Sequence, residues 1–461
     1  MREFTGAYPT EAHPTGQVRT FEIVAAESEL PPLEGDRLRV WAYNSQVPGP
    51  TLRVRLGDTV HVHFVNHLPQ PTTIHWHGVR LPNAMDGVPN LTQPPVMPGE
   101  SFDYQFTPKD AGTFWFHPHV RSSEQVERGL YGVLIVEDPQ PPPYAQDLLW
   151  VLDDWLLDEH GQIFPEFNTR HDLAHDGRWG RVITVNGHTA ERLALRAGER
   201  VRLRIVDTAN GRVFKPDFGA LEVQIIAVDG LYLRQPIPYR GFEIAPGNRL
   251  DLDITAPSAS SGTFVVTDRF YPPMPHALAT VVIDGMSPPT PAFPSPARAH
   301  VPVWSEGLAV PVTKQFRLNA RQGGPYGIEW TINDQAFRHD DGTHPAPDHD
   351  ADVDRGDAHA GHAMPPPALT MRQGTFQRLQ FVNESYRLHP IHLHGMFFRL
   401  LARNGVPVDE PFFRDTVLVH SRETIDIGLI PEDVGLWMMH CHILEHAEAG
   451  MMTTLRVQGT I

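Results

Sequence analysis

Residues 51–66 read TLRVRLGDTVHVHFVN, and two later stretches of the chain repeat their pattern. Residues 192–207 read RLALRAGERVRLRIVD, and residues 368–383 read ALTMRQGTFQRLQFVN. Each stretch alternates apolar and polar residues, turns at a glycine, alternates again and closes on Asn or Asp, which predicts a β-hairpin. The three turn glycines stand 141 and then 176 residues apart, a spacing typical of whole domains. We therefore predict an all-β chain with three copies of one β-sandwich-type domain.

Two proline-rich stretches mark the expected joints between these domains. Residues 138–144 read DPQPPPY, and residues 286–296 read MSPPTPAFPSP. Prolines favour stiff, extended linkers. We therefore expect domains at 1–138, 145–285 and 297–461.

The last domain is longer than the others, and residues 338–367 nearly account for the difference. This segment holds five His and seven Asp, a composition that cannot build an apolar core and that predicts a surface insert. His- and Asp-rich tracts also bind divalent ions. A metal-collecting loop is therefore the alternative interpretation of the same residues.

Composition narrows the range of partners. The formal net charge is −17, so nucleic acid and other polyphosphates have no electrostatic support as ligands. No run of 18 apolar residues occurs, so a membrane span is not expected. The first residues lack the apolar core of a signal peptide. We expect a secreted or periplasmic monomer whose leader is absent from this chain, and a cytoplasmic location stays open.

Residues 440–451 read HCHILEHAEAGM and include the only cysteine of the chain. A lone cysteine is most often an inert core residue, but this one stands among histidines. A blue-copper site takes one thiolate, two imidazoles and a weak axial thioether. Cys441, His446 and Met451 supply three of these donors, and His389 is the candidate for the second imidazole. For Met451, a place in the core is the alternative interpretation.

Four His-x-His motifs form the second metal signal. They are His75 with His77, His117 with His119, His392 with His394, and His440 with His442. In a strand, residues two apart share one face, so each motif presents two imidazoles together. A half-solvated strand explains a single pair, whereas four pairs, two near each end of the chain, indicate metal ions. Imidazole suits copper, zinc, iron and nickel, and the neighbouring thiolate favours copper.

These motifs together resemble those of the three-domain multicopper oxidases. HWHG at 75–78, HPH at 117–119, HPIHLHG at 389–395 and HCHILEHAEAGM at 440–451 look like the four copper motifs of that family, in the same order. The likeness covers the whole chain and is closest to the bacterial laccases, with spore-coat laccases and copper-efflux oxidases as neighbours. It implies three consecutive cupredoxin-like domains, each a Greek-key β-sandwich or barrel, and four copper ions: one type 1, one type 2 and two type 3.

The resemblance also implies a role for each donor. His75 and His392 match the ligands of the type 2 copper. One type 3 copper matches His77, His117 and His442, and the other matches His119, His394 and His440. The type 1 copper matches His389, Cys441, His446 and Met451. The trinuclear cluster is then expected between the first and last domains, with the middle domain as a spacer without copper ligands.

Acidic residues near these motifs are candidates for proton transfer. Asp86 matches the acidic residue that follows the first motif in the family and lies near the type 2 copper, although an Asp-Gly turn also explains it. Spore-coat laccases usually carry Glu directly after the last type 1 His, where this chain has Ala447. Glu445 and Glu448 are the remaining candidates. Asp415 is expected either to support a metal ligand or to end a strand.

The expected function follows from the resemblance. A laccase-like enzyme would oxidise phenols or aromatic amines one electron at a time at the type 1 copper, through Cys441 and His446, and would reduce O₂ to water at the trinuclear cluster. The alternative is a cuprous-ion oxidase for copper tolerance, because copper-efflux oxidases carry a Met-rich insert where residues 338–367 stand. This segment has one Met, so soft ligands for Cu(I) are scarce in it. A simple electron carrier would leave eight histidines unexplained.

Overall fold

The structure is a computed structural model that describes residues 13–139, 141–258, 262–287, 306–338 and 366–459. Strands dominate these residues, and they form six sheets, two from each expected domain. The all-β prediction is therefore confirmed. No helix among the described residues is long and apolar enough to cross a membrane. The expected insert at 338–367 lies, except at its ends, outside the described residues.

The first sandwich consists of two four-stranded sheets. One has the order β2-β1-β4-β6, with β1 (Val18–Leu30), β2 (Leu38–Tyr43), β4 (Thr59–Asn66) and β6 (Ser101–Phe106). The other has the order β3-β8-β7-β5, with β3 (Thr51–Arg55), β5 (His75–His77), β7 (Gly112–His117) and β8 (Gly132–Glu137). Alternating apolar residues of both sheets form one core, for example Val62 and Phe64 of β4 with Leu134 of β8.

The second sandwich has sheets of six and four strands. The larger has the order β10-β9-β12-β16-β14-β15, with β9 (Asp147–Trp155), β10 (Val182–Val185), β12 (Arg200–Asp207), β14 (Glu222–Val228), β15 (Leu231–Pro238) and β16 (Arg249–Thr255). The smaller has the order β11-β18-β17-β13, with β11 (Glu191–Ala197), β13 (Pro216–Asp217), β17 (Gly262–Asp268) and β18 (His276–Met286). Their inward-facing apolar residues again form a single core cluster.

The third sandwich has sheets of six and five strands. The larger has the order β20-β19-β22-β27-β24-β25, with β19 (Lys314–Gln322), β20 (Ile328–Ile332), β22 (Gln377–Asn383), β24 (Arg399–Arg403), β25 (Val406–Pro407) and β27 (Thr424–Leu429). The other has the order β21-β29-β28-β23-β26, with β21 (Leu369–Arg372), β23 (His389–Leu393), β26 (Thr416–Val419), β28 (Gly435–Cys441) and β29 (Met452–Gln458). Cys441 and Met451 belong to the apolar core between these two sheets.

The three repeated stretches are confirmed as pairs of strands, but the hairpin prediction is wrong. β3 pairs with β8, whereas β4 pairs with β1 and β6, so the two strands of the first repeat lie in different sheets. The same holds for β11 and β12 and for β21 and β22. The alternating pattern of a strand shows which of its side chains face the core. Two strands that pair in one sheet and two strands that face each other across a sandwich have the same pattern, so the pattern does not distinguish them. The turn glycine of the first repeat, Gly57, has a φ of +92°, which a glycine adopts without strain.

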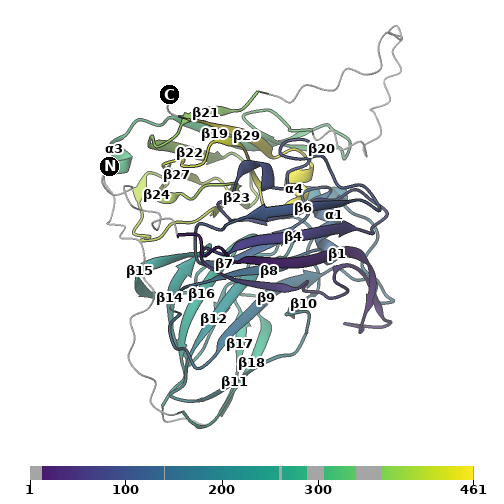
Figure 1. The fold of residues 1–461 in the computed structure, drawn as a ribbon, viewed down its shortest axis with the longest axis vertical. Helices are drawn as coiled ribbons and strands as arrows, with labels where there is room; N and C mark the ends of the chain where they lie inside the picture. Colours follow the sequence, from purple (N-terminus) through teal and green to yellow (C-terminus); the bar gives the residue numbers. More distant parts are fainter. Residues whose placement is uncertain (1–12, 140, 259–261, 288–305, 339–365, 460–461) are drawn as a thin grey trace.

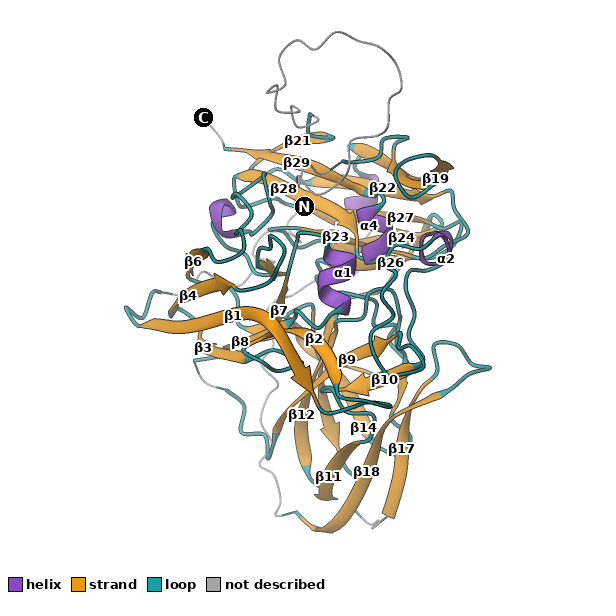
Figure 2. Ribbon diagram, turned by 90° about the vertical axis from the view of Figure 1, so that its right-hand side faces the viewer, coloured by secondary structure: helices purple, strands orange, loops and turns teal. Residues whose placement is uncertain are grey.

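The sandwiches pack closely against one another, with the third at the top of Figure 1, the first across the middle and the second below. Ile226 and Leu231 of the second sandwich and Phe397 and Leu401 of the third belong to the same apolar cluster as the core of the first. Short helices occupy the junction: α1 (Ser122–Glu127) contacts α4 (Leu444–Glu448), which also contacts α2 (Arg170–Ala174). Figure 2 shows α1 and α4 at this junction. The described residues also form α3 (Glu306–Ala309) and the 3₁₀ turn η1 (Asn83–Met85).

Candidate metal centre

Three donors gather at the end of β28, and we call them the Cys441 group: His389, Cys441 and His446. β23 and β28 are antiparallel neighbours that place Ile391 opposite Cys441, and α4 begins three residues after the cysteine. The Nδ1 atoms of His389 and His446 lie 3.2 Å apart, and they lie 3.6 and 3.8 Å from the Cys441 sulfur. All three side chains are fully buried. The structure therefore places these three predicted donors close enough to hold one ion.

Hydrogen bonds fix the tautomers of the two imidazoles in this group. His446 Nε2 donates to the carbonyl oxygen of His175 at 2.8 Å. The Ser385 hydroxyl donates to Asn383 Oδ1 and therefore accepts from His389 Nε2 at 2.9 Å. Both Nδ1 atoms consequently carry lone pairs that face each other and the sulfur. A cation bonded at about 2.0–2.3 Å to nitrogen and sulfur fits this triangle and removes the repulsion between the lone pairs.

Burial sets the charge of the Cys441 group. It raises the pKa of the Cys441 thiol well above the ordinary value and lowers the pKa of His446 to about 3. The imidazoles are therefore neutral, and a thiolate here requires a cation beside it. Met451 is buried in the same apolar cluster, and its carbonyl oxygen accepts the Cys441 amide hydrogen at 3.0 Å. Its position next to the cysteine fits the expected axial role, which stays a prediction.

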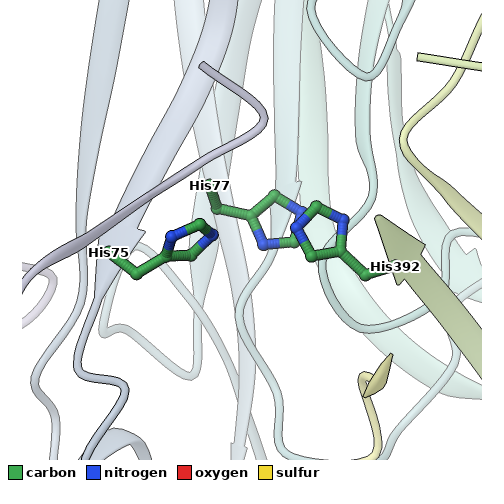
Figure 3. A group of neighbouring side chains, drawn as sticks. All are labelled: His75, His77 and His392. Atoms are coloured by element: carbon green, nitrogen blue, oxygen red, sulfur yellow. The ribbon is translucent and has the colours of Figure 1, made fainter. Parts of the chain in front are cut away.

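Eight further histidines, the eight-histidine group, meet between the first and third sandwiches. They are His75, His77, His117, His119, His392, His394, His440 and His442, and all are buried. Strand pairing positions them, because β5 and β7 place His75 opposite His117 while β23 and β28 place His392 opposite His440. Three sets within this group have ligand atoms within 4.8 Å of one another: His77, His117 and His442; His119, His394 and His440; and His75, His77 and His392. Figure 3 shows the last set, with His392 approaching from the strand opposite the other two.

The protonation of these imidazoles shows that the group is built for cations. His394 Nδ1 donates to Asp86, and His440 Nδ1 donates to the Cys441 carbonyl oxygen, both at 2.8 Å. Their Nε2 atoms therefore carry lone pairs, and these lie 3.1 Å apart. Nε2 of His75, His117 and His392 has no hydrogen-bond partner among the described residues. Leaving such buried nitrogens unsatisfied costs about 1–3 kcal/mol each, and metal ions would satisfy them.

Two buried carboxylates hold these imidazoles from behind. Asp86 Oδ1 lies 3.3 Å from His75 Nδ1, and Asp86 Oδ2 accepts from His394. Burial opposes ionisation of Asp86, but the two histidines outweigh it and hold the pKa of Asp86 well below its usual value. Asp415 lies 3.3 Å from both His77 Nε2 and His392 Nδ1. Each carboxylate therefore orients one ring from the first sandwich and one from the third.

The second sandwich also reaches this site, which the sequence did not indicate. Arg249 is fully buried, and its Nη1 and Nη2 donate to the two Asp415 carboxylate oxygens at 2.9 and 2.6 Å. Asp229 accepts the backbone amides of Arg249, Asp415 and Thr416. Arg249 thus links the second sandwich to a carboxylate that holds two histidines of the metal site.

The two glutamates expected near the site lie in different surroundings. Glu445 is buried and accepts from Asn210 of the second sandwich at 2.7 Å, and burial raises its pKa to about 7. Glu448 is partly exposed and lines a small cavity together with Ala447. The same cavity is lined by His117, His119 and His440. Of the two, Glu448 is therefore the one that shares a cavity with members of the eight-histidine group.

Comparison with known proteins identifies the class of the chain. Multicopper oxidase family models match residues 25–141, 146–283 and 334–460. The crystal structure of a multicopper oxidase from Pseudomonas thermotolerans is 33% identical, with a TM-score of 0.80 over 96% of this chain and 99% of that one. Multicopper oxidase MmcO of Mycobacterium tuberculosis is 28% identical over 92% of this chain and 84% of its own. Laccase-2 of Cryptococcus neoformans is 26% identical over 96% of this chain and 85% of its own.

The chain belongs to the multicopper oxidase family, as the resemblance predicted. It is an oxidoreductase whose cofactor is copper, and its three domains are cupredoxin-like. The Cys441 group fits a type 1 site, and the eight-histidine group fits a trinuclear site. The exact domain limits, the role of each donor, the location in the cell and the monomeric state stay predictions.

Proposed function

We propose that this protein is a laccase-like oxidase that takes single electrons from phenols or aromatic amines and reduces O₂ to two water molecules. The position of Cys441 carries this proposal. Its side chain belongs to the Cys441 group, while its chain neighbours His440 and His442 belong to the eight-histidine group. A covalent path therefore joins a site suited to one-electron uptake to a site with room for several metal ions.

The copper ions supply one-electron uptake at the first site and multi-electron delivery to O₂ at the second. In the proposal, His389, Cys441, His446 and Met451 hold the type 1 ion, and His75 and His392 hold the type 2 ion. The type 3 ions are held by His77, His117 and His442 and by His119, His394 and His440. Burial lowers the pKa of His117 and His442 well below the usual value, so these two imidazoles are neutral.

Reduction of O₂ also consumes protons, which must reach a buried site. We assign the delivery of these protons to Glu448, because its side chain lines the cavity that touches three of the eight histidines. Asp86 keeps His75 and His394 in the tautomer that exposes Nε2. Glu445 hydrogen-bonds Asn210 at the second sandwich instead, and this contact favours a role in joining the domains.

Oxygen uptake by the copper-loaded protein tests the proposal. A phenol and an aromatic amine are each supplied under air, beside cuprous ion as a third donor. We expect both aromatic donors to be oxidised, with one O₂ consumed for every four electrons. Oxidation of cuprous ion alone would contradict the laccase-like proposal and favour the metal oxidase. No oxygen uptake with any donor would contradict both.

A cuprous-ion oxidase is the second candidate. The Laccase-2 likeness does not support it, but one structural observation does. His171 and His175 of the second sandwich are exposed, and the His175 carbonyl oxygen accepts from His446 Nε2 at 2.8 Å.

A further inference from the structure

The segment around α2 of the second sandwich covers the Cys441 group from outside. Thr169 begins the helix with a capping box, in which its side chain and that of Asp172 each accept the other's backbone amide. Leu173 is buried in the core of the third sandwich, and its carbonyl oxygen accepts from Trp330 Nε1 at 2.9 Å. Asp176 accepts the Leu388 amide at 2.9 Å. The segment is therefore attached firmly to the third sandwich, although it belongs to the second.

Two imidazoles project from this segment into solvent, and we call them the α2 histidine pair: His171 and His175. His171 lies in α2, and His175, four residues later, is the residue at which the helix ends. Their rings stack with centroids 4.3 Å apart and an interplanar angle of 21°. Both residues are exposed, and the His171 side chain is 77% exposed. Neither imidazole fills a core.

The tautomer of His175 is suited to metal binding. Its Nδ1 donates to the His171 carbonyl oxygen at 2.8 Å, so its Nε2 carries a lone pair. Histidines that bind metals usually donate the other ring N–H to a carbonyl or carboxylate in this way. Two imidazoles at a spacing of four on a helix also form part of known metal sites. The pair therefore offers two nitrogen donors on one exposed helical turn.

One hydrogen bond joins this pair to the Cys441 group. The His175 carbonyl oxygen accepts the proton of His446 Nε2 at 2.8 Å. An electron arriving at the His175 imidazole thus needs to cross a few covalent bonds and this hydrogen bond to reach His446.

We propose that the α2 histidine pair is an entry site for cuprous ion, and that the protein oxidises this ion as a substrate. Imidazole is a suitable copper ligand. Each Cu(I) bound there becomes Cu(II) and gives one electron through His175 to His446. Four such electrons, with four protons and one O₂, give two water molecules. The inference rests on the proposed oxidase function for its O₂-reducing site, but it does not require that phenols be substrates.

The binding test uses the copper-loaded protein and Ag(I). This cation has the same charge as Cu(I), but the protein does not oxidise it. Equilibrium dialysis compares the wild type with His171→Ala, and His160→Ala is the control because the His160 side chain is 71% exposed. We expect His171→Ala to bind one Ag(I) fewer than either other protein. His171→Met should restore the lost site, because a thioether binds Cu(I)-like ions.

The kinetic test measures oxygen uptake with Cu(I) and, separately, with a phenol. We expect His171→Ala to raise the KM for Cu(I) at least about tenfold, a size typical of disturbed metal sites, and His171→Met to reverse this rise. The phenol KM and kcat should match those of His160→Ala. Equal Ag(I) binding and equal Cu(I) kinetics in His171→Ala and His160→Ala would overturn the inference. Loss of phenol turnover in His171→Ala would overturn it too, because the residue would then be structural.

These outcomes are separable from those of the proposed function. If the wild type oxidises no phenol but does oxidise Cu(I) in a His171-dependent way, the laccase-like proposal fails and the entry site stands. If phenols are oxidised and Ag(I) binding does not depend on His171, the entry site fails and the laccase-like proposal stands.

Discussion

The Cys441 group and the eight-histidine group share β28, but they are built in different ways. All three donors of the Cys441 group come from the third sandwich, from β23, β28 and α4. The eight-histidine group takes four imidazoles from the first sandwich and four from the third, and the second adds Arg249 behind them. The first site therefore takes its donors from one domain, with a carbonyl oxygen of the second sandwich beside His446, whereas the second site needs three domains in their final positions. Changes at domain contacts should harm the two sites unequally.

The largest effect is expected from Cys441→Ser, which removes the thiolate that defines the first site. Serine is a hard ligand and does not replace it. We expect loss of the intense blue absorption and a fall in phenol turnover of more than about 100-fold, beyond what outer contacts of a metal site contribute. Metal analysis should still find the copper of the eight-histidine group. Retained turnover would show that electrons enter by another route.

Arg249→Met should damage the eight-histidine group and spare the Cys441 group. Arg249 is the buried cation that pairs with Asp415 and lies 3.7 Å from Asp229 Oδ1. Removing one partner of a buried ion pair costs about 3–5 kcal/mol of unfolding free energy. We expect copper to be lost from the eight-histidine group and turnover to fall about 10–100-fold, while the blue absorption remains. Chemical denaturation and metal analysis measure the two effects.

Arg202→Met is the control for this prediction. Arg202 is also a buried arginine of the second sandwich, and it pairs with Asp251. The Arg202→Met substitution should lower the unfolding free energy without lowering the copper content. Equal copper loss in both variants would show that Arg249 acts only through general stability.

Gly247→Ala also tests the contact between the second sandwich and the eight-histidine group, and a smaller effect on turnover is expected from it than from Arg249→Met. Gly247 has a φ of +90°, and a Cβ there would lie 2.9 Å from His77 Cε1 and 3.0 Å from His442 Cδ2. We expect turnover to fall about tenfold through displaced imidazoles. Gly99→Ala has a similar φ of +82° with nothing within 4 Å, so it carries the backbone strain of about 1–3 kcal/mol alone. Equal activity in the two variants would contradict the account.

The smallest effect is expected from Ser385→Ala, which alters only the Cys441 group. It removes the oxygen that accepts the N–H of His389 Nε2. We expect a shift of the blue absorption and of the redox potential, with turnover changed less than about tenfold. The copper content of the eight-histidine group should not change. Loss of that copper would show that the two sites are less independent than their construction suggests.

The donors could be predicted from the sequence because metal chemistry constrains residue type and local spacing together. His440, Cys441 and His442 are adjacent, and each of the other His-x-His motifs begins in a strand, β5, β7 or β23, whose alternation sets the direction of its side chains. Asp86 and Asp415 could be named as candidates from the sequence, but the contacts that the second sandwich makes with these sites could not be predicted. Arg249 and Asp415 are 166 residues apart, and His175 and His446 are 271 apart. Nothing in the local sequence of either residue indicates such a contact.

Contacts between residues far apart in the sequence also limited the prediction of the fold. Alternation at 51–66, 192–207 and 368–383 correctly predicted six strands, because it reports which side chains enter the core. It did not predict that each pair divides between two sheets, since strand pairing depends on residues far away in the chain. β4, for example, pairs with β1 and β6, and β3 pairs with β8.

The central claim is that one chain segment joins a one-copper site to a three-copper site. Copper content and the visible and near-ultraviolet spectrum of the copper-loaded wild type test it most directly. We expect four copper ions per chain, intense blue absorption from the Cys441 group and a near-ultraviolet shoulder from a coupled pair of ions in the eight-histidine group. One copper ion per chain with blue absorption and no shoulder would contradict it, because the eight-histidine group would then hold no cluster.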